Sequence, residues 1–243
     1  MTTTLIRSKD RKVANLVNST GKASVIANTF GLPSGKAFSC PGATTVCETI
    51  CYAGKLEKIF KGVREVLVHN FELLKSADFD GMVDMLDEMI TDFEKECDKR
   101  NADKLFRIHW DGDFFNEDYA LAWRSVIERH TATQFWVYTR SDFAVYALLG
   151  LDNLGLYFST DSANKELGEE LARVTGVKLA YLANTFEEGK NDMRQMNRDG
   201  KAGVPCPENN RKLPMISTAG SACVTCKQCV FARNDILFSA TKK

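Results

Sequence analysis

Residues 134–162, QFWVYTRSDFAVYALLGLDNLGLYFSTDS, contain a complete strand–helix–strand unit. Both ends of this stretch are short runs of aromatic, β-branched and other apolar residues, a composition typical of buried strands. The middle segment, DFAVYALLG, predicts a short helix. Two strands joined by a helix run parallel through a right-handed crossover, so the stretch predicts an α/β fold on a parallel sheet.

The same alternation continues on both sides of this unit. Upstream, the spacing of apolar residues predicts a strand over 22–30, helices over 55–76 and 78–100 with Asp80 as an N-cap, a strand over 104–114 and a helix over 116–130. Downstream it predicts a helix over 164–176, a strand over 177–185 and a sixth strand near the C-terminus. This number of strands suits a partial or open (β/α) barrel better than a complete eightfold one. We therefore expect a single barrel-like α/β domain over residues 1–243.

The composition is that of an ordinary globular protein. The 243 residues are 44% apolar and 26% charged with a formal net charge of zero, and no apolar run is long enough to span a bilayer. These features disfavour a membrane or nucleic acid as partner. The first residues, MTTTLIRSKDRK, lack the apolar core of a signal peptide, so we expect a cytoplasmic protein. Eight cysteines in that reducing compartment indicate metal or redox chemistry rather than disulfides.

The C-terminal cysteines have a specific spacing. From residue 199 onward the chain is rich in Gly, Pro, Asn and Cys, which predicts a cysteine-rich, metal-bound cap over 199–243. Cys223, Cys226 and Cys229 form C-x2-C-x2-C, the spacing that wraps three thiolates around a [4Fe–4S] cluster in bacterial ferredoxins. A distant cysteine before a proline supplies another ligand in those proteins, and Cys206 precedes Pro207. Zinc is the alternative metal for these four thiols.

A second group of cysteines follows the first predicted strand. Cys40, Cys47 and Cys51 form C-x6-C-x3-C. Three cysteines on a four-iron cluster would leave one iron open to a cofactor. A single cluster that takes ligands from both groups is the alternative. Cys97 stands alone on a charged helix, where an unliganded thiol is expected.

Polar residues follow several predicted strands. In parallel α/β folds the ligand site lies at the carboxyl ends of the strands, so these residues point to one cavity. Asp111, Asp113 and His109 are candidates for acid–base chemistry, and Arg140 for binding a carboxylate or phosphate. Thr160 is a candidate cofactor ligand on the same edge. Each of these residues also has a plain alternative, namely a polar strand end or an ion pair.

The segments CPGATTVCETICYAGK, FRIHWDGDF and VYTRS, together with the terminal cysteine cluster, resemble the phage gene product 88 family over nearly the whole chain. This resemblance implies a phage-encoded protein that works in the host cytoplasm. At one remove, the pattern is similar to radical S-adenosylmethionine enzymes, which carry a cysteine loop after the first strand of a partial barrel. That similarity implies that Cys47 and Cys51 match two of the cluster ligands and that Tyr52 lies near the aromatic position. It also implies that Asp113 takes the place of the carboxylate that holds the cofactor's amino group.

Three functional hypotheses follow from these patterns. The first is an iron–sulfur protein with a radical-enzyme-like barrel that performs redox or radical chemistry on a small molecule or nucleotide, with S-adenosylmethionine as a candidate cofactor. The second is an electron carrier or redox sensor, with a cluster fully ligated by cysteines and a redox partner. The third is a zinc-stabilised protein that binds a host factor.

Overall fold

The chain folds around a seven-stranded sheet in which neighbouring strands are parallel. The computed structural model describes residues 4–13, 26–196, 200–217 and 220–241. Across the sheet the strands are β1 (Thr29–Gly31), β2 (Leu105–Asp111), β3 (Gln134–Thr139), β4 (Leu154–Thr160), β5 (Lys178–Ala183), β9 (Ile236–Ser239) and β6 (Val204–Pro205). The predicted α/β fold on a parallel sheet is confirmed, and so is the sixth strand near the C-terminus.

The strand order is sequential from β1 to β5, so each crossover moves the chain one place along the sheet in the same direction. Because every crossover has the same hand, sequential winding places the connecting helices on one face. The edges of the sheet are β1 and β6, and no pairing joins them among the described strands. A closed barrel is therefore not what these strands form.

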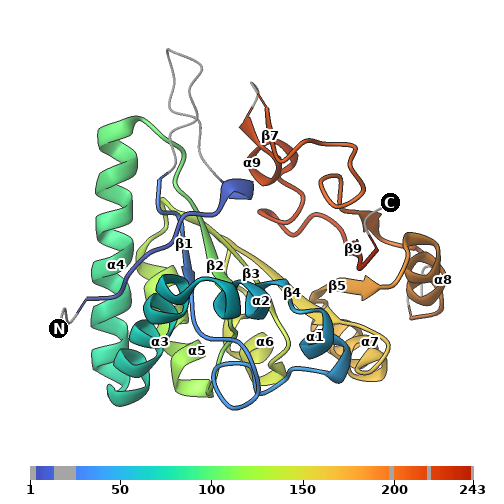
Figure 1. Cartoon of the computed structure of the whole chain (residues 1–243), viewed down its shortest axis with the longest axis horizontal. Helices are drawn as coiled ribbons and strands as arrows, with labels where there is room; N and C mark the ends of the chain where they lie inside the picture. The colour runs from blue at the N-terminus through green and yellow to red at the C-terminus, as the bar shows by residue number, and fades with distance from the viewer. Residues whose placement is uncertain (1–3, 14–25, 197–199, 218–219, 242–243) are drawn as a thin grey trace.

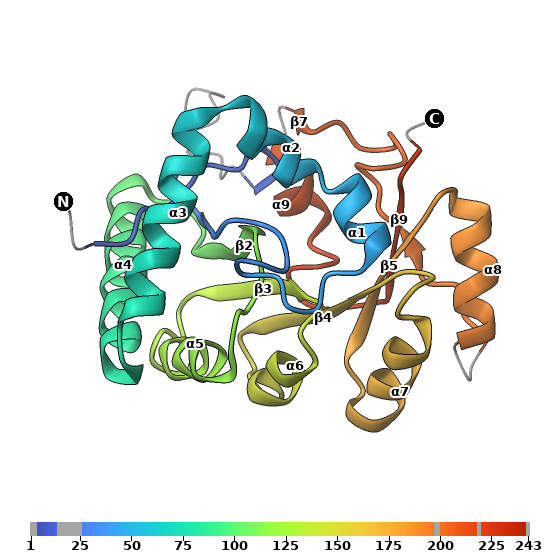
Figure 2. The ribbon, with the colours of Figure 1, turned by 60° about the horizontal axis from the view of Figure 1, so that its bottom comes forward.

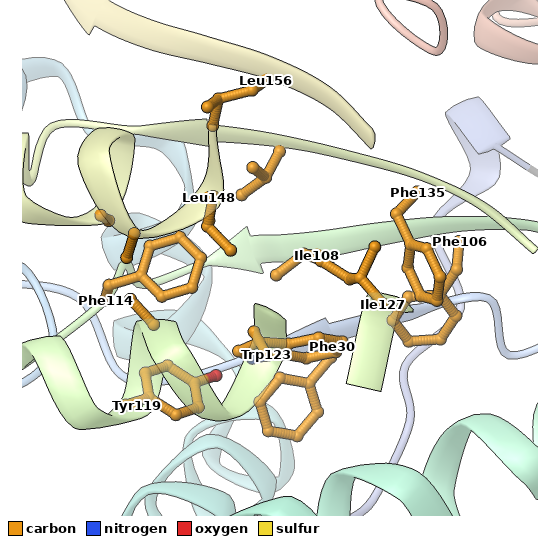
Figure 3. Packing of buried hydrophobic residues seen from close by; sticks show 14 of the residues in the cluster. Phe30, Phe106, Ile108, Phe114, Tyr119, Trp123, Ile127, Phe135, Leu148 and Leu156 are labelled. Atoms are coloured by element: carbon orange, nitrogen blue, oxygen red, sulfur yellow. The ribbon is translucent and has the colours of Figure 1, made fainter. Parts of the chain in front are cut away.

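One face of the sheet is covered by a layer of helices (Figures 1 and 2). These helices are α4 (Phe79–Arg100), α5 (Glu117–Arg129), α6 (Asp142–Leu148), α7 (Lys165–Thr175) and α8 (Phe186–Met196). Helix α3 (Lys61–Ser76) packs beside β1, where the Asn70 side chain donates to the Gly31 carbonyl at 3.2 Å. The layer is held by the main hydrophobic core, in which Trp123 of α5 packs against Phe30, Phe106 and Phe135 of the strands (Figure 3).

The opposite face carries shorter elements. Figure 2 shows α1 (Thr45–Ile50), α2 (Tyr52–Ile59) and α9 (Ala222–Cys226) on the side of the sheet away from α5, α6 and α7. The antiparallel pair β7 (Ile216–Ser217) and β8 (Gly220–Ser221) and the 3-10 helix Arg11–Val13 lie near α9. Two smaller apolar clusters hold this layer, one around Trp136 and Val230 and one around Tyr157 and Ile236. We call this side the inner face.

Several predicted boundaries differ from the structure. The helix expected over 55–76 is two helices, because Phe60 adopts an extended backbone (φ −114°, ψ 98°) between α2 and α3. The N-cap of α4 is Asp78 rather than Asp80, since the Asp78 carboxylate accepts the Gly81 N–H at 2.9 Å. Only the end of the strand expected over 22–30 belongs to β1, and residues 22–25 lie outside the described part of the chain.

The predicted cap over 199–243 also needs correction. Residue 199 lies outside the described residues, and the segment that follows does not form a separate layer. Strands β6 and β9 belong to the main sheet, and Ile236 and Leu237 of β9 are fully buried in it. Only the stretch between these strands lies over the inner face. The apolar run ILFS buries enough surface to join the sheet as the predicted C-terminal strand.

Candidate metal centre

The C-terminal cysteines converge on the inner face. Cys206 directly follows β6, and its N–H donates to the Leu237 carbonyl of β9 at 2.9 Å. Cys223 and Cys226 lie on α9, which ends at Lys227 in a left-handed conformation (φ 55°). That residue reverses the chain, so Cys229 returns toward the sheet. Cys206 and Cys229 thus pack in one apolar cluster although they are far apart in the sequence, and Cys223 packs with Cys229 in another.

The buried C-terminal thiols raise one another's pKa. Burial raises the pKa of the Cys229 thiol to about 12, and the thiolates of Cys206 and Cys226 add to the increase. Burial likewise raises the pKa of Cys223 to about 12, with further contributions from Cys229 and Cys206. Buried thiols that repel each other's charge stay protonated without a cation. They become thiolates when a metal binds and compensates that charge.

Aromatic side chains of the sheet hold the cysteine turn in place. The Tyr157 hydroxyl of β4 donates to the Asn234 carbonyl at 2.9 Å and to the Gln228 carbonyl at 3.3 Å. The Tyr138 hydroxyl of β3 hydrogen-bonds to Cys229 and so opposes the increase in the pKa of that thiol. The turn is therefore fixed to two neighbouring strands from below.

A glycine lets the turn approach the sheet closely. A Cβ placed on Gly155 of β4 would lie 2.4 Å from the Cys229 carbonyl oxygen and 2.6 Å from that of Val230. No side chain fits in that space, so the backbone of the cysteine segment rests directly on the strand. Gly155 thus sets the depth of the cysteine turn over the inner face.

The N-terminal cysteines lie at the carboxyl end of the sheet. Thr44 caps α1 by accepting the Cys47 N–H at 3.0 Å, and it donates its hydroxyl hydrogen to Asp161 at 2.6 Å. Asp161 forms an ion pair with Arg140 at 2.8 Å. Arg140 in turn hydrogen-bonds to Cys47 and opposes the increase in the pKa of its thiol that burial causes. The cysteine loop is thereby tied to the ends of β3 and β4.

The three N-terminal thiols are not equivalent. The charge of Cys51 adds to the increase in the pKa of the Cys47 thiol. The Cys51 sulfur accepts the Gly54 N–H at 3.3 Å, so Cys51 is the N-cap of α2. Cys40 lies instead beside carboxylates. Burial and then the charge of Asp113 raise the pKa of the Cys40 thiol well above its ordinary value. Ser39 links Cys40 to Asp113, because its hydroxyl oxygen accepts the Asp113 N–H at 3.1 Å and lies 3.8 Å from the Cys40 sulfur.

Asp113 is fully engaged in local hydrogen bonds. Its carboxylate accepts the Thr139 hydroxyl at 2.7 Å, the Arg140 N–H at 2.7 Å and the Phe114 N–H at 2.8 Å. Burial raises the pKa of Asp113 to about 6, and these hydrogen bonds limit the increase. Its carboxylate joins the ends of β2 and β3, an arrangement that stabilises the carboxyl edge of the sheet.

Asp111 has a different environment and a partner that sequence analysis missed. Both Asp111 and Glu57 of α2 are buried, and the two carboxyl groups interact with each other. One Glu57 oxygen accepts the Ser34 N–H at 2.9 Å and the Ser34 hydroxyl at 2.5 Å. One Asp111 oxygen is buried without a partner among the described residues. Burial, then the charge of Glu57, raises the pKa of Asp111 to about 8, so Asp111 is mostly protonated at neutral pH.

A signal for Glu57 was present in the sequence. It follows Ala53 by one helical turn, and both residues belong to the buried side of α2.

The remaining candidates lie away from the inner face or at its rim. His109 has a left-handed backbone (φ 58°), and its ring packs on the helix side against Phe114, with Nε2 2.8 Å from the Tyr119 hydroxyl oxygen. Thr160 faces α7, where Gly168 lies against its side chain. Tyr52 is 55% exposed and donates its hydroxyl hydrogen to the Trp110 carbonyl at 3.0 Å.

Comparison with known proteins identifies relatives over the full length. The gene 88 protein of Mycobacterium phage L5 is 50% identical over 244 residues, which cover 98% of this chain and 99% of the relative. The gene 88 protein of Mycobacterium phage D29 is 50% identical over 245 residues, with the same coverage. Both relatives are phage proteins, which supports a phage origin for this chain. The similarity to radical S-adenosylmethionine proteins is not shown by these comparisons.

No solved structure matches the chain. Among the described residues, no helix has the length and apolar character needed to cross a membrane. The sequence profile of gene product 88 matches residues 3–232, so that the chain belongs to the gene product 88 family.

Proposed function

We propose that this protein is an iron–sulfur protein of the host cytoplasm whose cysteines Cys206, Cys223, Cys226 and Cys229 bind a [4Fe–4S] cluster. The observation that supports the proposal is the packing of Cys206, Cys223 and Cys229 together on the inner face of one parallel sheet, with Cys226 on the same short helix as Cys223. A bound cluster would supply or accept one electron. We propose redox or radical chemistry on a small molecule or nucleotide, with the open parallel sheet acting as a partial (β/α) barrel around the substrate.

The spacing of the C-terminal cysteines favours a cluster over a single zinc ion. Cys223, Cys226 and Cys229 form an unbroken C-x2-C-x2-C, the ferredoxin spacing that wraps three thiolates around one face of a four-iron cubane, and Cys206 precedes a proline as the distant ligand does in those proteins. Structural zinc sites instead use two separate pairs of ligands. Among the described residues, no group of three or more Cys, His, Asp or Glu side chains is placed to hold a single ion.

The carboxyl edge of the sheet supplies the candidate residues for substrate chemistry. Asp111, buried beside Glu57 with a raised pKa, would donate or accept a proton next to a bound substrate. Arg140 would bind an anionic group of that substrate if it left Asp161. Cys40, Cys47 and Cys51 form a second candidate metal site at this edge. S-adenosylmethionine is the candidate cofactor there, with Tyr52 and Thr160 as the other proposed cofactor-binding residues.

One observation supports the electron carrier as a second candidate function. Asp113 is the residue proposed to hold the amino group of S-adenosylmethionine, and its carboxylate already accepts three hydrogen bonds from the protein. A cofactor would have to displace at least one of them. In an electron carrier or redox sensor the cysteine ligands would complete the cluster, and a redox partner would take the place of a substrate.

The test is the metal content of protein purified without oxygen. We expect about four irons and four sulfides per chain for one cluster, or about twice these amounts if the N-terminal site is also filled. We also expect a brown colour from thiolate-to-iron charge transfer. A colourless protein with one zinc per chain and no sulfide would support the zinc-stabilised binding protein instead. Addition of S-adenosylmethionine to the reduced protein separates the remaining two: a changed electron paramagnetic resonance spectrum supports the radical enzyme, and an unchanged one supports the electron carrier.

A further inference from the structure

Arg107 is a charged residue in the middle of strand β2. Its neighbours Phe106 and Ile108 face the helix layer and belong to the main core. Successive side chains of a strand point to opposite faces, so Arg107 points to the inner face. Its side chain is 14% exposed. A charge in this position is costly to bury unless nearby groups compensate it.

The partners of Arg107 leave one donor unused. Its Nη1 donates to Asp10 at 2.9 Å, and its guanidinium lies over the ring of Tyr138, 5.5 Å from the centroid. The Nε atom is buried and has no hydrogen-bond partner among the described residues. Unpaired buried donors are rare in proteins, and each calls for an acceptor that is missing.

The sulfur atoms of the C-terminal cysteines are candidate acceptors for this donor. The side chains of Cys223 and Cys229 pack in the same cluster as Tyr138 on the inner face. The ring of Tyr138, over which Arg107 lies, carries the hydroxyl that bonds to Cys229.

We propose that Arg107 is a positioning residue for the metal centre, in which Nε–H donates a hydrogen bond to a ligand sulfur and the guanidinium charge holds the reduction potential of the cluster up. The inference rests on the proposed function. A [4Fe–4S] centre with four thiolates gains one electron from a reductant such as dithionite, and its total charge changes from −2 to −3. A buried cation and a hydrogen bond to sulfur both favour the more negative state.

Asp10 gives the inference a test with two opposite signs. Its carboxylate partly cancels the Arg107 charge, so D10N leaves more positive charge beside the centre. We expect R107M to lower the reduction potential and D10N to raise it. R107K keeps the charge but loses the Nε–H donor and the planar fork, and its potential is expected between those of wild type and R107M. A merely structural role would not produce shifts of opposite sign.

The experiment is a potentiometric titration of anaerobically purified full-length protein with dithionite, followed by electron paramagnetic resonance. R124M is the matched control, because Arg124 of α5 binds the carbonyls of Ala147 and Leu149 in the helix layer. Its potential should equal that of wild type. If R107M fails to fold, R107K and D10N carry the test.

Two failures can be told apart. Iron-loaded variants whose potentials equal that of wild type, or shift in the same direction for R107M and D10N, would overturn the role of Arg107 alone. Wild-type protein that contains no iron after anaerobic purification would overturn the proposed function, and the role of Arg107 with it.

Discussion

Gly155 of β4 lies directly beneath Cys229, and a Cβ added to it would lie only 2.4 Å from the carbonyl oxygen of Cys229. This contact joins the cysteine turn to the sheet without any side chain between them. The metal centre proposed for the C-terminal cysteines therefore depends on the backbone of a strand that sequence analysis placed in the core. The relationship explains why a glycine interrupts the apolar run LGLYF.

Substitution of Gly155 should disturb the metal centre more than the fold. We expect G155A to cost about 1–3 kcal/mol of stability through overpacking, and to lower the iron content because the turn is pushed off the sheet. Thermal unfolding and iron analysis on the same samples measure both effects. G62A is the control, because a Cβ on Gly62 of α3 meets nothing within 4 Å. Equal iron content in G155A and wild type would contradict the prediction.

Tyr157 should anchor the cysteine turn through its hydroxyl. Y157F removes the donor to the Asn234 and Gln228 carbonyls, and we expect a loss of about 1–2 kcal/mol with faster release of iron to a chelator. Y146F is the matched control, since Tyr146 of α6 is 55% exposed on the helix layer. Release rates that are the same in Y157F and Y146F would show that the hydroxyl does not hold the turn.

The Asp111–Glu57 pair should make stability depend on pH. The pKa of Asp111 in the folded protein is raised to about 8, above its ordinary value of 3.8. The folded state then holds a proton that the unfolded state releases, so this contribution is present below about pH 4 and is lost as pH rises toward 8. D111N removes the titration, and its stability relative to wild type should increase between pH 5 and 8, by at most about 1.4 kcal/mol per pH unit.

Chemical denaturation of D111N and wild type at several pH values measures this difference. D142N serves as the control, because Asp142 is an exposed residue at the start of α6. If the difference in unfolding free energy between D111N and wild type stayed constant across this range, Asp111 would not take up a proton on folding.

His109 should change the pH dependence of stability in the opposite direction. Burial, with a smaller effect from Arg107, lowers the pKa of His109 to about 3. Its contribution to stability is present above about pH 6.5 and is lost as pH falls toward 3. We expect H109N to lose less stability than wild type on acidification, and asparagine tolerates the left-handed backbone at this position. Unfolding curves at pH 7 and pH 4.5 measure this difference, with H69N as the control. If H109N and H69N changed the loss of stability on acidification by the same amount, burial of His109 would not be its cause.

Strong periodicity made the central part of the fold predictable. The expected strands over 134–141 and 154–162 and the helix between them match β3, β4 and α6 within two residues at each end. Their apolar residues alternate between the two faces of a buried sheet, so the pattern and the packing agree. The same reasoning missed α1, a helix of six residues inside the cysteine loop, because its stability comes from the Thr44 cap and contacts with strand ends.

The metal ligands named from the cysteine spacing remain a prediction, and their surroundings could not be predicted. The structure packs Cys223 and Cys229 in one apolar cluster and Cys206 and Cys229 in another on the inner face. The orientation of His109 could not be predicted, because its left-handed backbone interrupts the alternation of β2 where the register with β1 shifts. Arg107 carried a signal that was not used: a charge between two apolar residues of a buried strand needs a partner on the other face.

The central claim is that the C-terminal cysteines bind the cluster, and metal analysis of two triple variants tests it most directly. Iron and acid-labile sulfide would be measured in anaerobically purified C223S/C226S/C229S and C40S/C47S/C51S, with C97S as a control for loss of a buried thiol. The account predicts that the first variant loses the C-terminal cluster, whereas the second and the control retain about four irons per chain. Loss of all iron from the N-terminal variant, with full retention in the C-terminal one, would contradict it.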